Sequence, residues 1–147
     1  MLQQAQQLKY LIKEMHDCCQ DRMLFESNKF NLPQAELKCL MLFVGERNLT
    51  AKHIANKMDV AKSRVTKIID GLIRKGYVTS THDQNDARIK LLNITPSGQR
   101  KLEEVESFIL EIHKRLLFQI EPNERENVLK YLETLRQSMD NVKVTLV

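Results

Sequence analysis

Residues that break helices are rare in this chain, which has four glycines and three prolines among its 147 residues. Several of them stand where a run of helix-periodic apolar residues begins or stops. Pro33 and Pro122 precede such runs, and Gly45 and Gly76 follow the ends of others. Because proline is tolerated in the first turn of a helix and glycine just past its end, this distribution predicts long helices with few tight turns.

Apolar residues recur every three or four positions in most segments between these breaks, which is the spacing of one helix face. Thr50 is suited to cap a short helix through Met58, and Asp59 and Val60 then supply a brief turn before the next helix. The predicted helices cover residues 1–25, 33–45, 51–58, 61–75 and 97–120, with a last helix from 122 onward.

Two short runs of β-branched and apolar residues, 77–81 and 90–94, interrupt this helical pattern. The polar stretch HDQNDARI separates them, so they are predicted to form a hairpin with a long charged tip. The order of elements is four helices, a hairpin, a long helix and a final helix. The expected fold class is therefore mainly α with a small β-hairpin wing.

The first helix and the last two carry apolar stripes longer than a single small domain can cover. The middle of the chain, about 32–94, can close a small core of its own. A second copy of the same helices is the natural partner for the remaining stripes, which predicts a homodimer. The expected architecture, with two short helices before the hairpin, is a winged helix-turn-helix with terminal dimerisation helices.

Composition constrains the cellular location and the binding partners of the protein less strongly than the pattern of apolar residues constrains its fold. Apolar residues make up 42% and charged residues 29%, which is ordinary for a globular protein, and the net charge of +4 is compatible with an anionic partner. The longest apolar run, 39–44, is too short to cross a bilayer, and the N-terminal stretch lacks the apolar region of a signal peptide. We therefore expect no membrane association and a cytoplasmic location.

Three cysteines, Cys18, Cys19 and Cys39, form no CxxC pair, so reduced thiols are expected. They are expected to lie among apolar residues, and a role as small hydrophobic side chains is favoured over reactivity. With His16 they match no zinc signature, so no metal site and no cofactor are predicted.

The helix predicted at 61–75 has a basic and hydroxylated outer face in its first two turns. Two short helices joined by a tight turn, the second with such a face, can place a helix in the major groove of DNA. Arg64 is the candidate for reading guanine, because its guanidinium can donate to two acceptors at once. Lys62 and Lys67 are candidates for phosphate contacts, and Ser63 and Thr66 complete the expected face.

The run VAKSRVTKIIDGLIRKGYV at 60–78, followed by DQNDAR at 83–88 and LLNITPSG at 91–98, resembles the MarR family of bacterial and archaeal regulators. The resemblance implies a single chain over 1–147, with a winged helix-turn-helix DNA-binding lobe at 32–95. Segments 1–31 and 96–147 would then be dimerisation helices. It also implies a sequence-specific transcriptional regulator that binds a palindromic double-stranded DNA operator, in the manner of a repressor released by a small phenolic or other aromatic effector.

Residue roles in the wing follow from the same resemblance. Arg88 is expected to enter the minor groove, Lys90 to contact DNA beside it, and Asp83 and Asp86 to support the wing loop. The sequence departs from the family pattern at His82 and Ala87, where arginines are frequent. It departs again at Ala61, where a capping Ser or Asp is common and alanine offers no side-chain acceptor.

Other classes of function have less support in the sequence. Catalysis is not expected, because the sequence has no Gly-rich phosphate loop, GxSxG or HExxH motif. A winged-helix protein-interaction module is an alternative, although the cations of the segment 61–75 argue against it. A thiol-responsive or metal-responsive regulator of the same fold is a further alternative.

Overall fold

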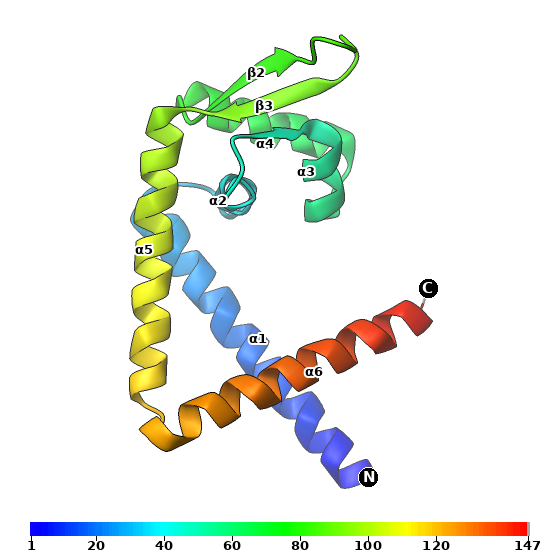
Figure 1. Ribbon diagram of the computed structural model, residues 1–147, viewed down its shortest axis with the longest axis vertical. Coiled ribbons are helices and arrows are strands. Elements are labelled where there is room, and N and C mark those ends of the chain that lie inside the picture. Colours follow the sequence, from blue (N-terminus) through cyan, green and yellow to red (C-terminus); the bar gives the residue numbers. More distant parts are fainter. Residues whose placement is uncertain (147) are drawn as a thin grey trace. The chain divides into compact units, whose positions relative to one another are not determined.

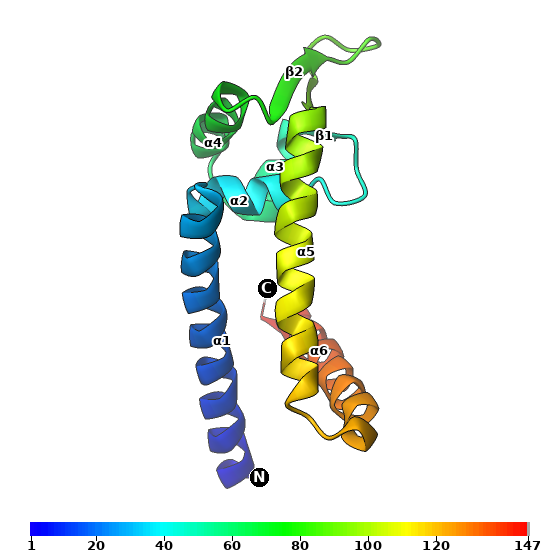
Figure 2. The same ribbon diagram turned by 90° about the vertical axis from the view of Figure 1, so that its left-hand side faces the viewer.

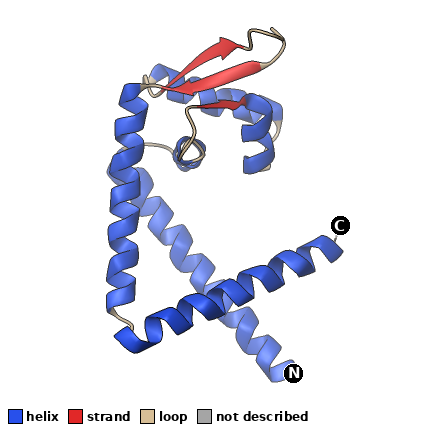
Figure 3. Cartoon of the chain, viewed as in Figure 1, coloured by secondary structure: helices blue, strands red, loops and turns tan. Residues whose placement is uncertain are grey.

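The computed structural model describes residues 1–146, which are mainly helical with one small antiparallel sheet, as the sequence predicts (Figures 1 and 3). The helices are α1 (Leu2–Phe30), α2 (Gln34–Met41), α3 (Ala51–Met58), α4 (Lys62–Arg74), α5 (Pro96–Phe118), the short 3-10 helix η1 (Pro122–Glu124) and α6 (Arg125–Thr145). The strands are β1 (Asn48–Thr50), β2 (Val78–His82) and β3 (Lys90–Ile94).

The chain divides into two compact units, and the boundary falls inside α5. The first unit is Met1–Val105 and the second begins at Glu106. Helices α2, α3 and α4 and the sheet belong to the first unit, and the β2–β3 hairpin extends beyond these helices (Figures 1 and 2). Along residues 1–146, no helix combines the length and apolar character needed to span a bilayer.

The core of the first unit is built from the predicted apolar faces. Its members are less than one-tenth exposed, and each such aliphatic or aromatic side chain contributes about 1.5–3 kcal/mol when it is removed from water. They include Leu37, Leu40, Phe43, Ile54, Val65, Ile69, Leu72, Leu92, Leu102 and Val105. This core joins α2, α3 and α4 to β3 and to the first turns of α5, and so fixes the base of the wing.

The sheet has a strand that the sequence analysis missed. Strand order is β1-β3-β2, and β1 pairs with β3 through Leu49 opposite Leu92. The hairpin itself was predicted, and its register runs from Val78 opposite Ile94 to His82 opposite Lys90. Strand β1 has three residues, which is too short to show the alternation by which a strand is recognised in sequence.

Two predicted helix ends were wrong. Helix α1 continues to Phe30 instead of about Phe25, and Asn31 ends it in the left-handed conformation with φ 52°. Asparagine takes the place that glycine usually has at this position, so no glycine marked the end. Helix α2 ends at Met41, and the following residues form single turns up to Gly45, where φ is 75°.

The start of α5 is held to the hairpin by a network centred on Thr95. Its hydroxyl donates to the Gly76 carbonyl at 2.6 Å and accepts from the backbone N–H of Gly98 at 2.9 Å, so it caps α5. The Thr95 N–H donates to the Tyr77 carbonyl at 3.0 Å. A Cβ at position 98 would collide with the same carbonyl, so this close approach requires glycine.

In the second unit, Arg125 fixes the corner between α5 and α6. Its Nε donates to the carbonyls of Leu117 and Ile120 at 2.8 and 3.1 Å, which satisfies acceptors at the end of α5. The guanidinium also lies over the Phe118 ring, 5.5 Å from its centroid. Both helices of this unit carry exposed apolar side chains, namely Leu110, Leu116, Leu129, Leu132, Met139 and Val142.

Candidate nucleic-acid interface

Helices α3 and α4 form the predicted pair of short helices. The Thr50 side chain accepts from the His53 N–H at 3.1 Å and caps α3, as predicted. Asp59 then takes the left-handed conformation with φ 52°, and α4 begins three residues later. Ala61 precedes α4 without a side-chain hydrogen bond, so the first N–H groups of α4 lack that acceptor.

Helix α4 has two distinct faces. Val65, Ile68, Ile69 and Leu72 are buried, whereas the side chains predicted to meet DNA are exposed. These exposed residues are Lys62, Ser63, Arg64, Thr66 and Lys67. The Thr66 hydroxyl donates to the Lys62 carbonyl at 3.1 Å, so its oxygen remains available as an acceptor.

A groove of about 640 Å³ lies between α4 and the wing. It brings together predicted residues of both elements, because its lining includes Lys62, Ser63, Thr66, Arg88 and Lys90. Three further lining residues, Thr50, Ala51 and Lys52, come from the start of α3 and were not predicted. One sequence signal could have identified Lys52: Thr50 is the N-cap of α3, so Lys52 lies in the first turn of that helix.

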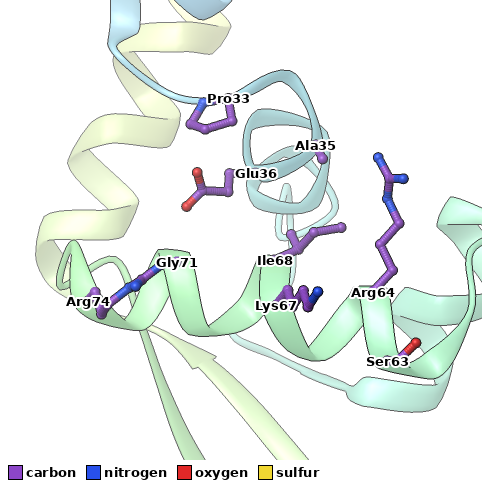
Figure 4. Close-up of a pocket in the computed structure, with 9 residues that line it drawn as sticks. All are labelled: Pro33, Ala35, Glu36, Ser63, Arg64, Lys67, Ile68, Gly71 and Arg74. Carbon is purple, nitrogen blue, oxygen red and sulfur yellow. The ribbon is translucent and has the colours of Figure 1, made fainter.

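A second cleft, of about 470 Å³, lies on the other flank of α4, toward α2 (Figure 4). Arg64 and Lys67 line this cleft and not the groove beside the wing. Ser63 lines both, so it lies on the ridge between them. The cleft is otherwise lined by Pro33, Ala35, Glu36, Ile68, Gly71 and Arg74.

Glu36 is buried in this cleft and was missed by the sequence analysis. Its two carboxylate oxygens accept from Lys75 Nζ at 2.8 and 2.9 Å, which ties α2 to the end of α4. A Cβ at position 71 would overlap the Glu36 carboxylate, so any larger residue there would displace this side chain from its present position. The Glu36 side chain is 8% exposed, so its charge needs such a partner. Sequence spacing carried no signal for this pair, because its members are 39 residues apart.

The wing loop is ordered by its two aspartates. The Asp83 carboxylate accepts from the backbone N–H groups of Asn85 and Asp86 at 2.7 and 3.1 Å. Asp86 accepts from the backbone N–H of Arg88 and from its guanidinium, at 3.0 Å to Nε and 3.1 Å to Nη2. These hydrogen bonds hold the pKa of Asp86 below its usual range and raise the pKa of Arg88.

The Arg88 side chain is 91% exposed despite this ion pair. One edge of its guanidinium is held by Asp86, and the remaining N–H groups point to solvent. Arg88 is therefore oriented by the loop and still able to reach a ligand.

The cysteines differ from the expectation that all three lie among apolar residues. That expectation was wrong for Cys18 and Cys19, which are exposed on α1. It holds for Cys39, where burial raises the pKa of the thiol to about 12, with a smaller contribution from the charge of Glu36. Within the described residues, no three His, Cys, Asp or Glu side chains are placed to hold a metal ion.

The segment that carries this geometry matches a known family model. The MarR family model matches residues 32–90. The chain is 28% identical over 116 residues to the HTH-type transcriptional regulator YfiV of Bacillus subtilis, covering 78% of this chain and 72% of YfiV. It is 34% identical over 86 residues to the HTH-type transcriptional repressor MdtR of the same organism, covering 58% and 56%. Both relatives are named as regulators of transcription and not as enzymes.

A solved structure shows the same fold over most of the chain. A MarR family protein from Bacillus stearothermophilus superimposes with a TM-score of 0.86 at 21% identity, covering 95% of this chain and 98% of that one. The matched segment 32–90 contains α2, α3, α4 and the wing, which carry the two grooves described above. Residues 32–90 of this chain thus match the MarR family model, and the chain as a whole has the fold of a MarR family protein and is similar to winged helix-turn-helix regulators of transcription.

Proposed function

We propose that the protein represses transcription by binding a palindromic DNA operator as a homodimer, and that a small aromatic ligand releases it. The groove between α4 and the wing carries this proposal, because cations from three separate segments line it: Lys52, Lys62, Arg88 and Lys90. Each cation that contacts a phosphate releases counterions from DNA, which supplies affinity independent of sequence. The groove lies directly beside the exposed face of α4, so phosphate contacts there would orient that face toward base edges.

Within this proposal, residues 32–95 are the DNA-binding lobe, and each predicted site residue has a role. Arg64 reads guanine, Ser63 and Thr66 offer hydroxyls to bases, and Lys62, Lys67 and Lys90 contact phosphates. Arg88 enters the minor groove, where a narrow groove concentrates negative potential, while Asp83 and Asp86 support its loop. The protein would act in the cytoplasm, where the DNA of a bacterium or archaeon lies.

The homodimer is supported by exposed apolar side chains on α1, α5 and α6. Leu8, Leu11 and Met15 follow one another along α1 and are more than two-fifths exposed in the single chain. Leaving contiguous apolar surface in water is unfavourable, so a second copy is the expected cover. Segments 1–31 and 96–147 are the proposed dimerisation helices, and the effector would be a phenolic or similar amphipathic compound.

Fluorescence anisotropy with labelled DNA tests the proposal. The DNA upstream of the protein's own gene is titrated with protein at rising salt, beside a scrambled duplex of equal length. A specific repressor should bind the upstream DNA at least 1000-fold more tightly than the scrambled duplex, and both affinities should fall as salt rises. Equal, weak binding to both would favour a protein-interaction module instead.

A further inference from the structure

The exposed ridge of α4 carries one acidic side chain among its cations. Ser63, Lys67, Asp70 and Arg74 are separated by four, three and four residues, so they lie on the same face of the helix. All four are exposed, and they lie opposite the buried face of Val65, Ile69 and Leu72. Asp70 stands with Lys67, Ile73 and Arg74 around an open depression of about 550 Å³.

The Asp70 carboxylate makes no ion pair or hydrogen bond with any residue of the described chain, 1–146. This is informative because two cations stand at helical ion-pair spacing, Lys67 three residues before it and Arg74 four residues after it. Elsewhere on the surface an acidic residue four positions before an arginine does pair with it, as Glu111 does with Arg115 at 3.7 Å. The Asp70 oxygens are thus open to an external donor.

A carboxylate on a DNA-facing ridge cannot contribute to affinity through phosphates, because like charges repel. It can bind only where DNA offers a hydrogen-bond donor. In the major groove, guanine presents two acceptors, and thymine presents an acceptor and a methyl group. Adenine presents an amino group beside the N7 acceptor, which repels the second carboxylate oxygen, whereas cytosine presents its N4 amino group alone.

We propose that Asp70 is a specificity-determining residue that accepts a hydrogen bond from the N4 amino group of one cytosine in each operator half-site. DNA without a cytosine at that position is penalised, because the carboxylate then loses its water without gaining a donor. This inference rests on the proposed DNA-binding function and assigns one base to one residue. Asp70 would then help the protein to discriminate between DNA sequences. Its charge lowers the overall affinity for DNA, and the neighbouring cations offset this loss.

The test selects binding sites from a randomised duplex library with the full-length protein and two variants. The wild-type protein should enrich one site with a cytosine at a fixed position of each half-site. Asp70→Ala should lose preference at that position and keep the rest of the site. Asp70→Asn should change the preferred base to adenine, since an amide can both donate to N7 and accept from N6. Glu104→Gln, which removes an exposed carboxylate from α5, is the matched control and should select the wild-type site.

Affinities measured on paired duplexes complete the test. Replacing the selected cytosine should weaken wild-type binding by about 10-fold or more and Asp70→Ala binding by less than about 2-fold. If Asp70→Ala keeps the wild-type preference and only binds every duplex more tightly, Asp70 is a general repulsive charge and the inference is wrong. If the wild-type protein selects no site at all, it is the proposed function that fails. Unchanged melting temperatures of both Asp70 variants would confirm that they are folded, so that differences in DNA affinity are due to the substituted side chain.

Discussion

Glu36 and Lys75 form an ion pair that joins α2 to the C-terminal end of α4, with both carboxylate oxygens within 2.9 Å of the lysine Nζ. The Glu36 side chain is 8% exposed and that of Lys75 is 37% exposed. Gly71 lies between them on α4, with no room for a Cβ beside the carboxylate. The contact between α2 and the C-terminal part of α4 therefore includes one glycine and one charge pair in addition to the apolar core.

Gly71→Ala should lower the free energy of unfolding by about 1–3 kcal/mol, because overpacking at the carboxylate outweighs the roughly 1 kcal/mol gained in helix propensity. Urea denaturation measures this change. The double variant Gly71→Ala with Glu36→Ala should be more stable than the sum of the two single losses predicts, since shortening Glu36 makes room for the new methyl group. Strict additivity would show that the two residues do not compete for the same space.

Arg64 and Lys67 line the same cleft but are predicted to act differently on DNA. Arg64→Ala should cost about 1–3 kcal/mol of binding free energy on the preferred operator and much less on random DNA, because a forked guanidinium reads a base. Lys67→Ala should weaken binding to both DNAs about equally, as expected of a phosphate contact. Anisotropy titrations on the two duplexes measure both effects, and equal losses for Arg64→Ala would make it a phosphate contact too.

Local features of the fold were predictable because they depend on residues close in sequence. Thr50 and Asp59 set the ends of α3, and the buried stripe of α4 follows from its spacing alone. Strand β1 was not predictable, because three residues carry no period and their pairing with β3 is set by the fold. The same applies to Glu36, whose burial depends on Gly71 and Lys75 far along the chain.

The candidate site was predicted in composition but not in arrangement. The sequence placed Arg64 and Lys62 on one exposed face of α4, whereas the structure assigns them to different grooves on opposite flanks. Lys52 was missed because its place beside the wing depends on how α3 packs against α4. Asp70 was visible in the sequence, but its lack of an ion-pair partner among residues 1–146 is a matter of side-chain geometry.

Leu116→Glu should dissociate the proposed homodimer without unfolding the chain. Leu116 is 54% exposed in the single chain, so a charge is tolerated there until a partner covers it. In a desolvated interface the same charge is unfavourable by several kcal/mol, on the order of 3–5. Light scattering after size exclusion measures the mass at micromolar concentration. Glu126→Lys, which changes an exposed residue of α6, is the control, and a monomeric wild-type protein that binds DNA tightly would contradict the prediction.

The thiols should not act as the switch that releases DNA. Cys39 should resist thiol reagents in the native protein up to about pH 9, because burial raises its pKa to about 12 and keeps the thiol protonated. Cys18 and Cys19 are exposed and should be modified first, as mass spectrometry of timed samples would show. Peroxide treatment should leave operator affinity unchanged. Loss of binding on oxidation that is absent from the Cys18→Ser, Cys19→Ser variant would support the thiol-responsive alternative.

Operator affinity should depend on the ion pair between Asp86 and Arg88 at the wing. Arg88→Ala removes the side chain proposed to enter the minor groove and should weaken binding more than Lys90→Ala, while reducing any preference for A·T pairs at the flanks of the site. Asp86→Asn should weaken binding less, because it loosens the loop and leaves the inserted group in place. Anisotropy on operators with A·T or G·C flanks measures all three variants.

The charge state of Asp86 sets the pH range over which this arrangement persists. Its pKa is lowered in the folded protein by the hydrogen bonds from Arg88, so the pair is present above the ordinary carboxylate pKa and is lost only as the pH falls through the lowered value. Binding that depends on Asp86 should therefore not change between pH 8 and pH 5, and NMR titration of the Asp86 carboxyl should find its midpoint below that of a model peptide. If Asp86→Asn tightens binding and Arg88→Ala leaves it unchanged, the wing makes no contribution and recognition depends on α4 alone.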